Sequence, residues 1–222
     1  MAPTAITHPE STAVPTKVAQ EPQNYSVIVQ QLTDVARDVM NQAIDLLKNT
    51  LTDDKQLTYQ SEYIPGSTIG KHLRHARDHY VLLSKASWCL VMSRQLLNSF
   101  VGQAVADVTV AESSNGQAPA AALSYDARIR DTPMETSISA GIQAFEEAIK
   151  QLDDIAKYAP EDLPIVLTAD TGPYQQVLNT TYGRELWFGS LHAIHHWSMV
   201  RVIAGELAST DLGDASPILT FQ

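Results

Sequence analysis

Histidine is the residue type whose spacing in this sequence points most directly to chemistry. Six of the seven histidines fall into two groups, which are His72, His75 and His79, and then His192, His195 and His196. The residues at 192 and 196 are four apart, so on a helix their imidazoles lie on one side within reach of one cation. One histidine from the first group would complete a three-histidine site, which leaves coordination positions for water or substrate, as catalytic metal centres do.

Three imidazoles suit several divalent cations, so the spacing does not choose among Zn²⁺, Ni²⁺ and Fe²⁺. The two groups also support a different interpretation, in which the clustered histidines become charged together on mild acidification and the protein senses pH. The pattern is not the HExxH motif of zinc proteases, because Ala193 stands where that motif has its glutamate. Spacing alone therefore leaves a metal site and a pH sensor open.

Four segments with helical periodicity must position these histidines. Apolar residues recur in them at three- and four-residue steps, and the segments cover residues 24–50, 68–100, 132–159 and 182–207. The last segment is apolar on almost all sides, which predicts a helix buried in the core. Four long helices favour an all-α fold, a four-helix bundle with a long crossover between its second and third helices.

The helix ends and the connections carry their own signals. Ser67 is expected to cap the second helix, and Pro133 is expected to lie in the first turn of the third. A polar linker joins the first two helices, and residues 101–131 form the crossover, which is expected to be loop. Residues 164–180 alternate loosely around an Asp-Thr-Gly-Pro turn, which indicates a short β-hairpin before the fourth helix.

Composition limits the location and the partners. The chain has 222 residues, with 15 lysines and arginines against 25 acidic residues and a net charge of -10. An acidic surface without a basic stripe disfavours nucleic acid and membranes as partners, and no apolar run approaches the roughly 20 residues of a membrane span. The single cysteine, Cys89, cannot form an internal disulfide. We recognise no targeting signal and expect a cytoplasmic protein.

The domain organisation follows from the same patterns. Residues 1–23 are rich in proline, threonine and alanine and are expected to be a disordered tail. The helical bundle is assigned to residues 24–207, and residues 208–222 form a C-terminal extension. This length suffices for one domain with a complete hydrophobic core, so neither a disulfide nor a metal is needed to hold the fold.

Three segments resemble the DinB/YfiT-like family of four-helix-bundle metalloenzymes. They are, in order, STIGKHLRHARDHY at residues 67–80, SYDARIRDTPMET at 124–136 and RELWFGSLHAIHHWSMVRVIAGEL at 184–207. The resemblance covers about residues 24–207. Members of this family bind a divalent cation through one histidine of the second helix and an HxxxH motif of the fourth. The resemblance therefore implies that His75, His192 and His196 are the metal ligands.

The helical wheel and the resemblance differ on the ligand from the second helix. The apolar stripe of that helix runs closer to His72 and His79 than to His75, so the wheel alone would favour His72. The resemblance implies a site that opens at the edge of the bundle, where His75 can bind the metal. His72, His79 and His195 then become pocket residues that orient water or substrate by hydrogen bonds, or else ordinary polar surface.

The loop before the third helix provides three candidates for binding substrate, Tyr125, Arg128 and Arg130. If the loop folds over the metal, an arginine could hold a substrate carboxylate and the tyrosine could donate a proton. The competing interpretation is a loop that is held in place by salt bridges and caps the bundle. Glu185, in the first turn of the fourth helix, is expected to interact with the helix dipole.

The resemblance implies a metal-dependent enzyme that acts on a small molecule. Relatives with assigned chemistry include metal-dependent transferases that activate a low-molecular-weight thiol, and a thiol-dependent maleylpyruvate isomerase. By analogy, the metal would lower the pKa of a thiol or of water for transfer, isomerisation or hydrolysis. The alternatives are a non-catalytic metal-binding protein and the pH sensor. A homodimer is also expected, because relatives pair through helix faces.

Overall fold

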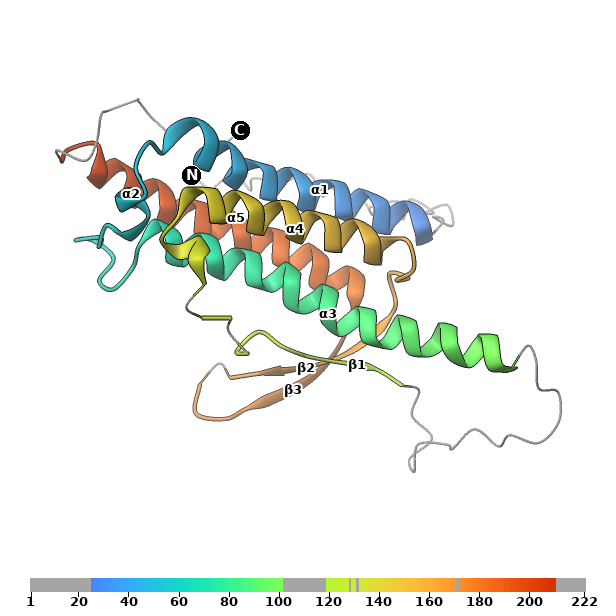
Figure 1. The fold of residues 1–222 in the computed structure, drawn as a ribbon. Coiled ribbons are helices and arrows are strands. Elements are labelled where there is room, and N and C mark those ends of the chain that lie inside the picture. The colour runs from blue at the N-terminus through green and yellow to red at the C-terminus, as the bar shows by residue number, and fades with distance from the viewer. Residues whose placement is uncertain (1–24, 102–118, 128, 131, 171, 211–222) are drawn as a thin grey trace, which may run out of the picture.

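The computed structural model describes residues 25–101, 119–127, 129–130, 132–170 and 172–210. Its four long helices are α1 (Tyr25–Asp45), α3 (Ile69–Val101), α4 (Ile138–Ala156) and α5 (Tyr182–Leu207). They lie side by side in Figure 1, with a small sheet below them. No helix in this described part is long and apolar enough to cross a membrane. The predicted tail, residues 1–23, and residues 211–222 of the predicted extension lie outside it.

The four long helices enclose the hydrophobic core. α3 packs against α4 and α5, and α1 also packs against α4 and α5. On α1, Ala36, Met40 and Ala43 recur at three- and four-residue steps and are fully buried. Phe145 of α4 meets Trp197 of α5 at a steep angle, with ring centres 6.4 Å apart. The periodic apolar positions of these helices therefore face one another in the core.

The helix boundaries follow the residues that cap them. The expected Ser67 cap is wrong by one position, because the amide of Lys71 donates to Thr68 Oγ1 at 3.1 Å. The third predicted helix is divided into a short 3₁₀ turn, η2 (Pro133–Glu135), and α4, which starts after its cap Ser137. A hydroxyl that accepts from the first turn thus marks the start of α3, α4 and α5. α5 begins and ends at the predicted residues.

Two short helical elements lie in the linker between α1 and α3. A π-helical turn, η1 (Leu46–Thr50), continues α1, and a single turn, α2 (Lys55–Thr58), follows it. Leu57 of α2 is fully buried, and the side-chain oxygen of Gln56 accepts from the amide of Thr52 at 2.7 Å. One buried apolar residue in a polar stretch has no periodicity, so the sequence pattern did not predict this turn.

A three-stranded sheet in the order β1-β2-β3 lies beside the helices. β2 (Pro164–Ala169) and β3 (Gln176–Thr181) pair antiparallel, which confirms the hairpin predicted before the fourth helix. β1 (Ala121–Ser124) pairs parallel to β2 and lies in the crossover that was expected to be loop. The fold is therefore mostly helical with a small sheet, so the all-α prediction describes the helices and omits the strands.

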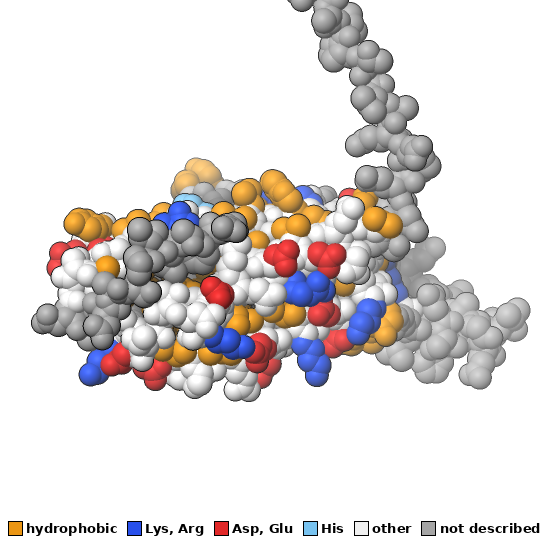
Figure 2. Space-filling model, turned by 90° about the horizontal axis from the view of Figure 1, so that it is seen from above, with side chains coloured by type: hydrophobic (Ala, Val, Ile, Leu, Met, Phe, Trp, Pro, Cys, Tyr) orange, Lys and Arg blue, Asp and Glu red, His pale blue; other side chains and the backbone are white. Residues whose placement is uncertain are grey.

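One side of α5 is exposed, which corrects the expectation of a helix buried all round. Trp187, Leu191 and Ile194 are 52%, 50% and 48% exposed. They recur at three- and four-residue steps and form one strip, which we call the exposed α5 stripe. The stripe is uncovered because α5 packs against α1 and α3 on its other sides. Figure 2 shows hydrophobic side chains gathered along one edge of the molecule, beside a histidine side chain.

Candidate metal centre

Three histidine side chains meet between α3 and α5. Nε2 of His192 lies 3.1 Å from Nε2 of His75 and 3.0 Å from Nε2 of His196. Each residue offers one ring nitrogen, and these nitrogens all lie within 4.8 Å of one another. All three side chains are partly exposed. The structure thus brings together the three histidines that the family resemblance implies as ligands, and we call them the histidine cluster.

The packing of α3 against α5 sets the direction of these side chains. The hydroxyl of Tyr80 on α3 donates to Ser190 Oγ on α5 at 3.3 Å, and both residues are buried. Ala76 of α3 and Ala193 of α5, each next to a histidine of the cluster, are fully buried. These contacts fix the rotation of both helices about their axes, and with it the direction of the imidazoles.

The contacts of His192 Nε2 fit a shared cation better than a set of hydrogen bonds. An imidazole nitrogen has one in-plane position, which holds either a lone pair or a proton, so it makes one well-aligned hydrogen bond. Nε2 of His192 has two nitrogen neighbours at nearly equal distance. A cation bound tetrahedrally at about 2.0–2.1 Å would space the nitrogens about 3.3 Å apart. The histidine cluster could therefore hold a divalent metal ion.

The surroundings keep His192 and His196 neutral, which is the form that binds metals. Burial, together with the neighbouring His75 and His192, lowers the pKa of His196 to about 2. Burial also lowers the pKa of His192 and of His72, in each case with a smaller contribution from the charge of His195. At neutral pH the rings therefore present lone pairs and single N–H groups rather than positive charges.

The other three histidines have different surroundings. Nδ1 of His72 lies 2.8 Å from Nδ1 of His196. His79 is 5% exposed, burial lowers its pKa to about 3, and its Nδ1 donates to the backbone carbonyl of His75 at 3.1 Å. His195 is exposed, with its ring centre 5.7 Å from that of His196. His72 thus contacts the cluster through a ring nitrogen, and His79 is held by a carbonyl of its own helix. His195 is at the surface.

Glu185, which was expected to interact with the helix dipole, is a fully buried carboxylate close to His79. Its Oε2 accepts from the Tyr125 hydroxyl at 2.9 Å, and its Oε1 accepts from Thr180 and Arg184 at 2.8 and 2.7 Å. The ring of Tyr125 stacks on His79, with centres 4.3 Å apart. Glu185 therefore holds the tyrosine in place, and an acid within an apolar helix was the sequence signal for this role.

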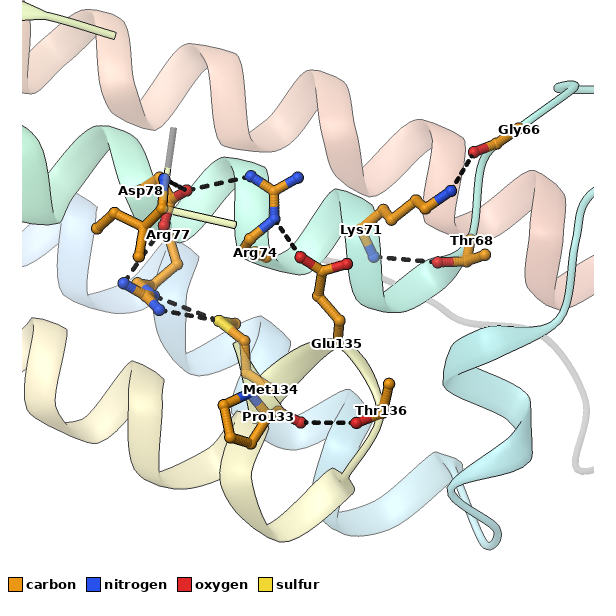
Figure 3. Close-up of polar contacts among 11 residues, drawn as sticks. Gly66, Thr68, Lys71, Arg74, Arg77, Asp78, Pro133, Met134, Glu135 and Thr136 are labelled. Carbon is orange, nitrogen blue, oxygen red and sulfur yellow. Dashed lines mark hydrogen bonds and ion pairs between the residues drawn. The ribbon is translucent and has the colours of Figure 1, made fainter. Parts of the chain in front are cut away.

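Buried charges tie the loop before α4 to α3, as Figure 3 shows. Arg74 pairs with Glu135 at 2.6 Å and with Asp78 at 3.2 Å. Asp78 also pairs with Arg77 at 3.3 Å and accepts from the amide of Ile129 at 3.3 Å. These contacts support the salt-bridged interpretation for this part of the loop. They lie on a different side of α3 from its histidines.

The three loop residues expected to bind substrate have different positions. Tyr125 reaches the histidine cluster only through His79, on which its ring stacks and whose ring centre lies 4.2 Å from that of His192, and its hydroxyl donates to Glu185. Arg130 is exposed, and Arg128 lies outside the described residues.

Comparison with known proteins gives a distant relative. The chain is similar to a protein named FK506-binding protein 5 from the fungus Rhizopus delemar, with 27% identity over 177 residues. The matched region covers 78% of this chain and 33% of that protein, so the chain spans about a third of the length of the curated relative it matches. No family model matches the chain, and no solved structure matches it.

Proposed function

We propose that this protein is a DinB-like four-helix-bundle metalloenzyme that binds one divalent ion through His75, His192 and His196. Two findings support the proposal. The four long helices pack in a closed set of pairs, as in a bundle, and the histidines of α3 and α5 converge although they are far apart in sequence. The observation that carries the proposal is the double contact at His192 Nε2, which one hydrogen bond cannot satisfy.

The depressed pKa values favour a metal site over a pH sensor. Burial first, and then the neighbouring histidines, hold the pKa of His196 at about 2. Burial likewise holds the pKa of His79 at about 3. Mild acidification leaves such rings neutral, so they would not act together as a charge switch between pH 5 and 7.

The donor set defines the chemistry that the site supports. A divalent ion held by three neutral imidazoles lowers the pKa of a bound thiol or water and favours the anionic form of that ligand. The chain's own residues would hold the ion, keep His192 and His196 neutral and cover one side of the site with the ring of Phe188, which stacks on His192. We therefore infer a small-molecule reaction in which a thiol or water is activated for transfer, isomerisation or hydrolysis. The same donors suit Zn²⁺, Ni²⁺ and Fe²⁺.

The direct test is the metal content of protein purified without a histidine tag. We expect about one metal per chain in the wild type, and less than about 0.2 in His192→Ala, because two imidazoles bind a divalent ion much less tightly than three. His195→Ala is the matched control, because that exposed histidine is on the same helix. A metal content that is low in the wild type and unchanged in His192→Ala would overturn the proposal.

Catalysis needs its own test, because a metal site alone also fits a non-catalytic metal-binding protein. The metal-loaded protein is incubated with a low-molecular-weight thiol and electrophilic acceptors, and separately with simple esters and lactones. We expect turnover that His192→Ala loses and His195→Ala keeps. Absence of turnover at full metal occupancy would favour the non-catalytic alternative.

We also propose a homodimer that forms through the exposed α5 stripe. The proposal is supported by three large apolar side chains that share one side of the helix and are each about half exposed. A second copy of the chain could cover these three side chains, and the stripe contains no charged side chain that would have to be buried with them.

A further inference from the structure

A line of three side chains leads along α5 to the histidine cluster. Arg184, Phe188 and His192 follow one another at four-residue steps, so they lie on one side of the helix. The guanidinium carbon of Arg184 lies 5.0 Å from the ring centre of Phe188. The ring of Phe188 stacks on that of His192, with centres 5.6 Å apart and planes 25° apart. A cation and an aromatic ring thus lie next to one of the proposed ligands.

Arg184 is both held in position and accessible. Its Nη1 donates at 2.7 Å to Oε1 of Glu185, whose side chain is fully buried, whereas the side chain of Arg184 is 52% exposed. Glu185 is itself fixed, because it accepts from Tyr125 and Thr180. A guanidinium has five N–H donors, and one carboxylate oxygen takes one of them. The remaining donors can bind an anionic group, with a geometry that the buried carboxylate keeps constant.

The distance along the helix limits the size of the ligand. Arg184 and His192 are eight residues apart, which corresponds to a rise of about 12 Å. A molecule bound to the metal through one end would pass Phe188 before its other end reached Arg184. An aromatic or other planar middle would pack against the edge of this ring, because Arg184 and His192 lie over its faces. A carboxylate would match the fork of the guanidinium.

We propose that Arg184 and Phe188 form the binding site for the far end of the metal-bound ligand. The site would select small molecules with a metal-binding thiol or oxygen at one end, a planar or apolar middle and an anionic group roughly 7 Å from that end. The rest of the rise of about 12 Å is taken up by the bond to the metal, about 2.3 Å for sulfur, and by the hydrogen bond to the guanidinium, about 2.8 Å. This inference rests on the proposed metal site. It assigns the substrate-binding role expected of the loop arginines to Arg184, a residue of α5 that is fixed before the ligand binds.

Two thiol probes of equal length test the charge preference. They are 4-(mercaptomethyl)benzoate and the uncharged 4-(mercaptomethyl)benzamide, added to the Co²⁺-loaded protein. Binding of the thiolate to cobalt is followed by visible absorption, which is independent of turnover. We expect the benzoate to bind about tenfold more tightly than the benzamide in the wild type, because a carboxylate gains a charge-assisted hydrogen bond.

The variants assign the preference to one residue. Arg184→Gln should bind the two probes equally, and Arg184→Lys should keep part of the preference because it keeps the charge. Arg201→Gln is the matched control, since Arg201 is an exposed arginine on the same helix near its other end. Stoichiometric Co²⁺ binding by each variant shows that the fold and the cluster are intact.

Three outcomes would overturn this inference. The wild type could bind the two probes equally, Arg184→Gln could keep the preference, or Arg201→Gln could lose it to the same degree. If Co²⁺ and the thiols bind but no preference appears, the inference fails and the proposed metal site stands. If the wild type takes up no Co²⁺, the proposed metal site fails, and this inference fails with it.

Discussion

The Nδ1 atom of His72 lies 2.8 Å from the Nδ1 atom of His196, so one imidazole donates a hydrogen bond to the other. When His196 presents Nε2 to a metal, its Nδ1 carries the proton and donates to His72. His72 then carries its own proton on Nε2, a buried atom without a hydrogen-bond partner in the described part of the chain. This pair fixes both the tautomer and the ring orientation of His196.

Removal of His72 should therefore weaken metal binding without removing a ligand. We expect His72→Ala to lower the affinity for Zn²⁺ by about 10–100-fold, the usual cost of losing the partner of a ligating histidine. Competition with a chromophoric chelator measures the affinity. His72→Gln, which offers a side-chain oxygen as acceptor, should recover part of it, whereas His195→Ala should bind like the wild type. Equal affinities in His72→Ala and His195→Ala would show that His72 does not orient the cluster.

The buried charges around Asp78 should be important for stability. Asp78 pairs with two arginines whose side chains are 10–11% exposed, and burial raises the pKa of its carboxyl. Asp78→Ala would leave both guanidinium groups buried without this partner, which costs about 3–5 kcal/mol of unfolding free energy. Urea unfolding measures the change. Asp34→Ala is the control, because Asp34 is 52% exposed and its ion pair with Arg37 is worth at most about 1 kcal/mol. A loss below about 1 kcal/mol in both variants would contradict the prediction.

The exposed α5 stripe should control the oligomeric state. We expect the wild type to have the mass of a dimer by light scattering and Leu191→Glu to have that of a monomer, because two charges cannot be buried at the centre of an apolar interface. Val35→Glu is the control, since Val35 is also 50% exposed but lies on α1. Both variants should keep their metal. A monomeric wild type would refute the dimer.

The metal-free protein should lose stability on mild acidification. The pKa values of His196 and His79 are about 2 and about 3, below the ordinary 6.5. Between about pH 6.5 and pH 3 the unfolded chain therefore binds protons that the folded chain does not, so stability falls as the pH falls. Each such histidine contributes about 0.7 kcal/mol between about pH 7 and pH 6, and the slope approaches about 1.4 kcal/mol per pH unit well below about pH 6.5.

Urea unfolding at pH 7, 6 and 5 in the presence of a chelator measures this dependence. His79→Gln should show a smaller slope, because its side chain does not titrate. A free energy of unfolding that stays constant from pH 7 to pH 5 would mean that the histidines are accessible to protons in the folded state.

Local properties of the chain were predictable from the sequence. His192 and His196 share one side of any helix, and the apolar residues from 182 to 207 recur over so many turns that both ends of α5 were found. The hairpin of β2 and β3 was also found, because its turn and both strands are contiguous in the chain. β1 was missed, because its partner β2 is far away in sequence.

Local sequence did not determine which histidine of α3 joins the histidine cluster. His72, His75 and His79 lie within an arc of about 60° on an ideal helix, so the wheel could not separate them. In the structure, Nε2 of His75 lies 3.1 Å from Nε2 of His192. Nδ1 of His72 instead lies 2.8 Å from Nδ1 of His196. The helical wheel favoured His72, which contacts the cluster at His196. The resemblance implied His75, whose Nε2 is one of the three nitrogens of the cluster.

By itself the sequence determined the four helices, the hairpin and the presence of imidazoles that could converge. Only the tertiary structure decided which ring nitrogens meet, because that depends on the rotation and register of α3 against α5, which contacts such as Tyr80 to Ser190 hold in place. It also decided the partners of Asp78 and Glu185. A buried charge needs a partner, and a linear pattern does not say which distant residue the fold will bring to it.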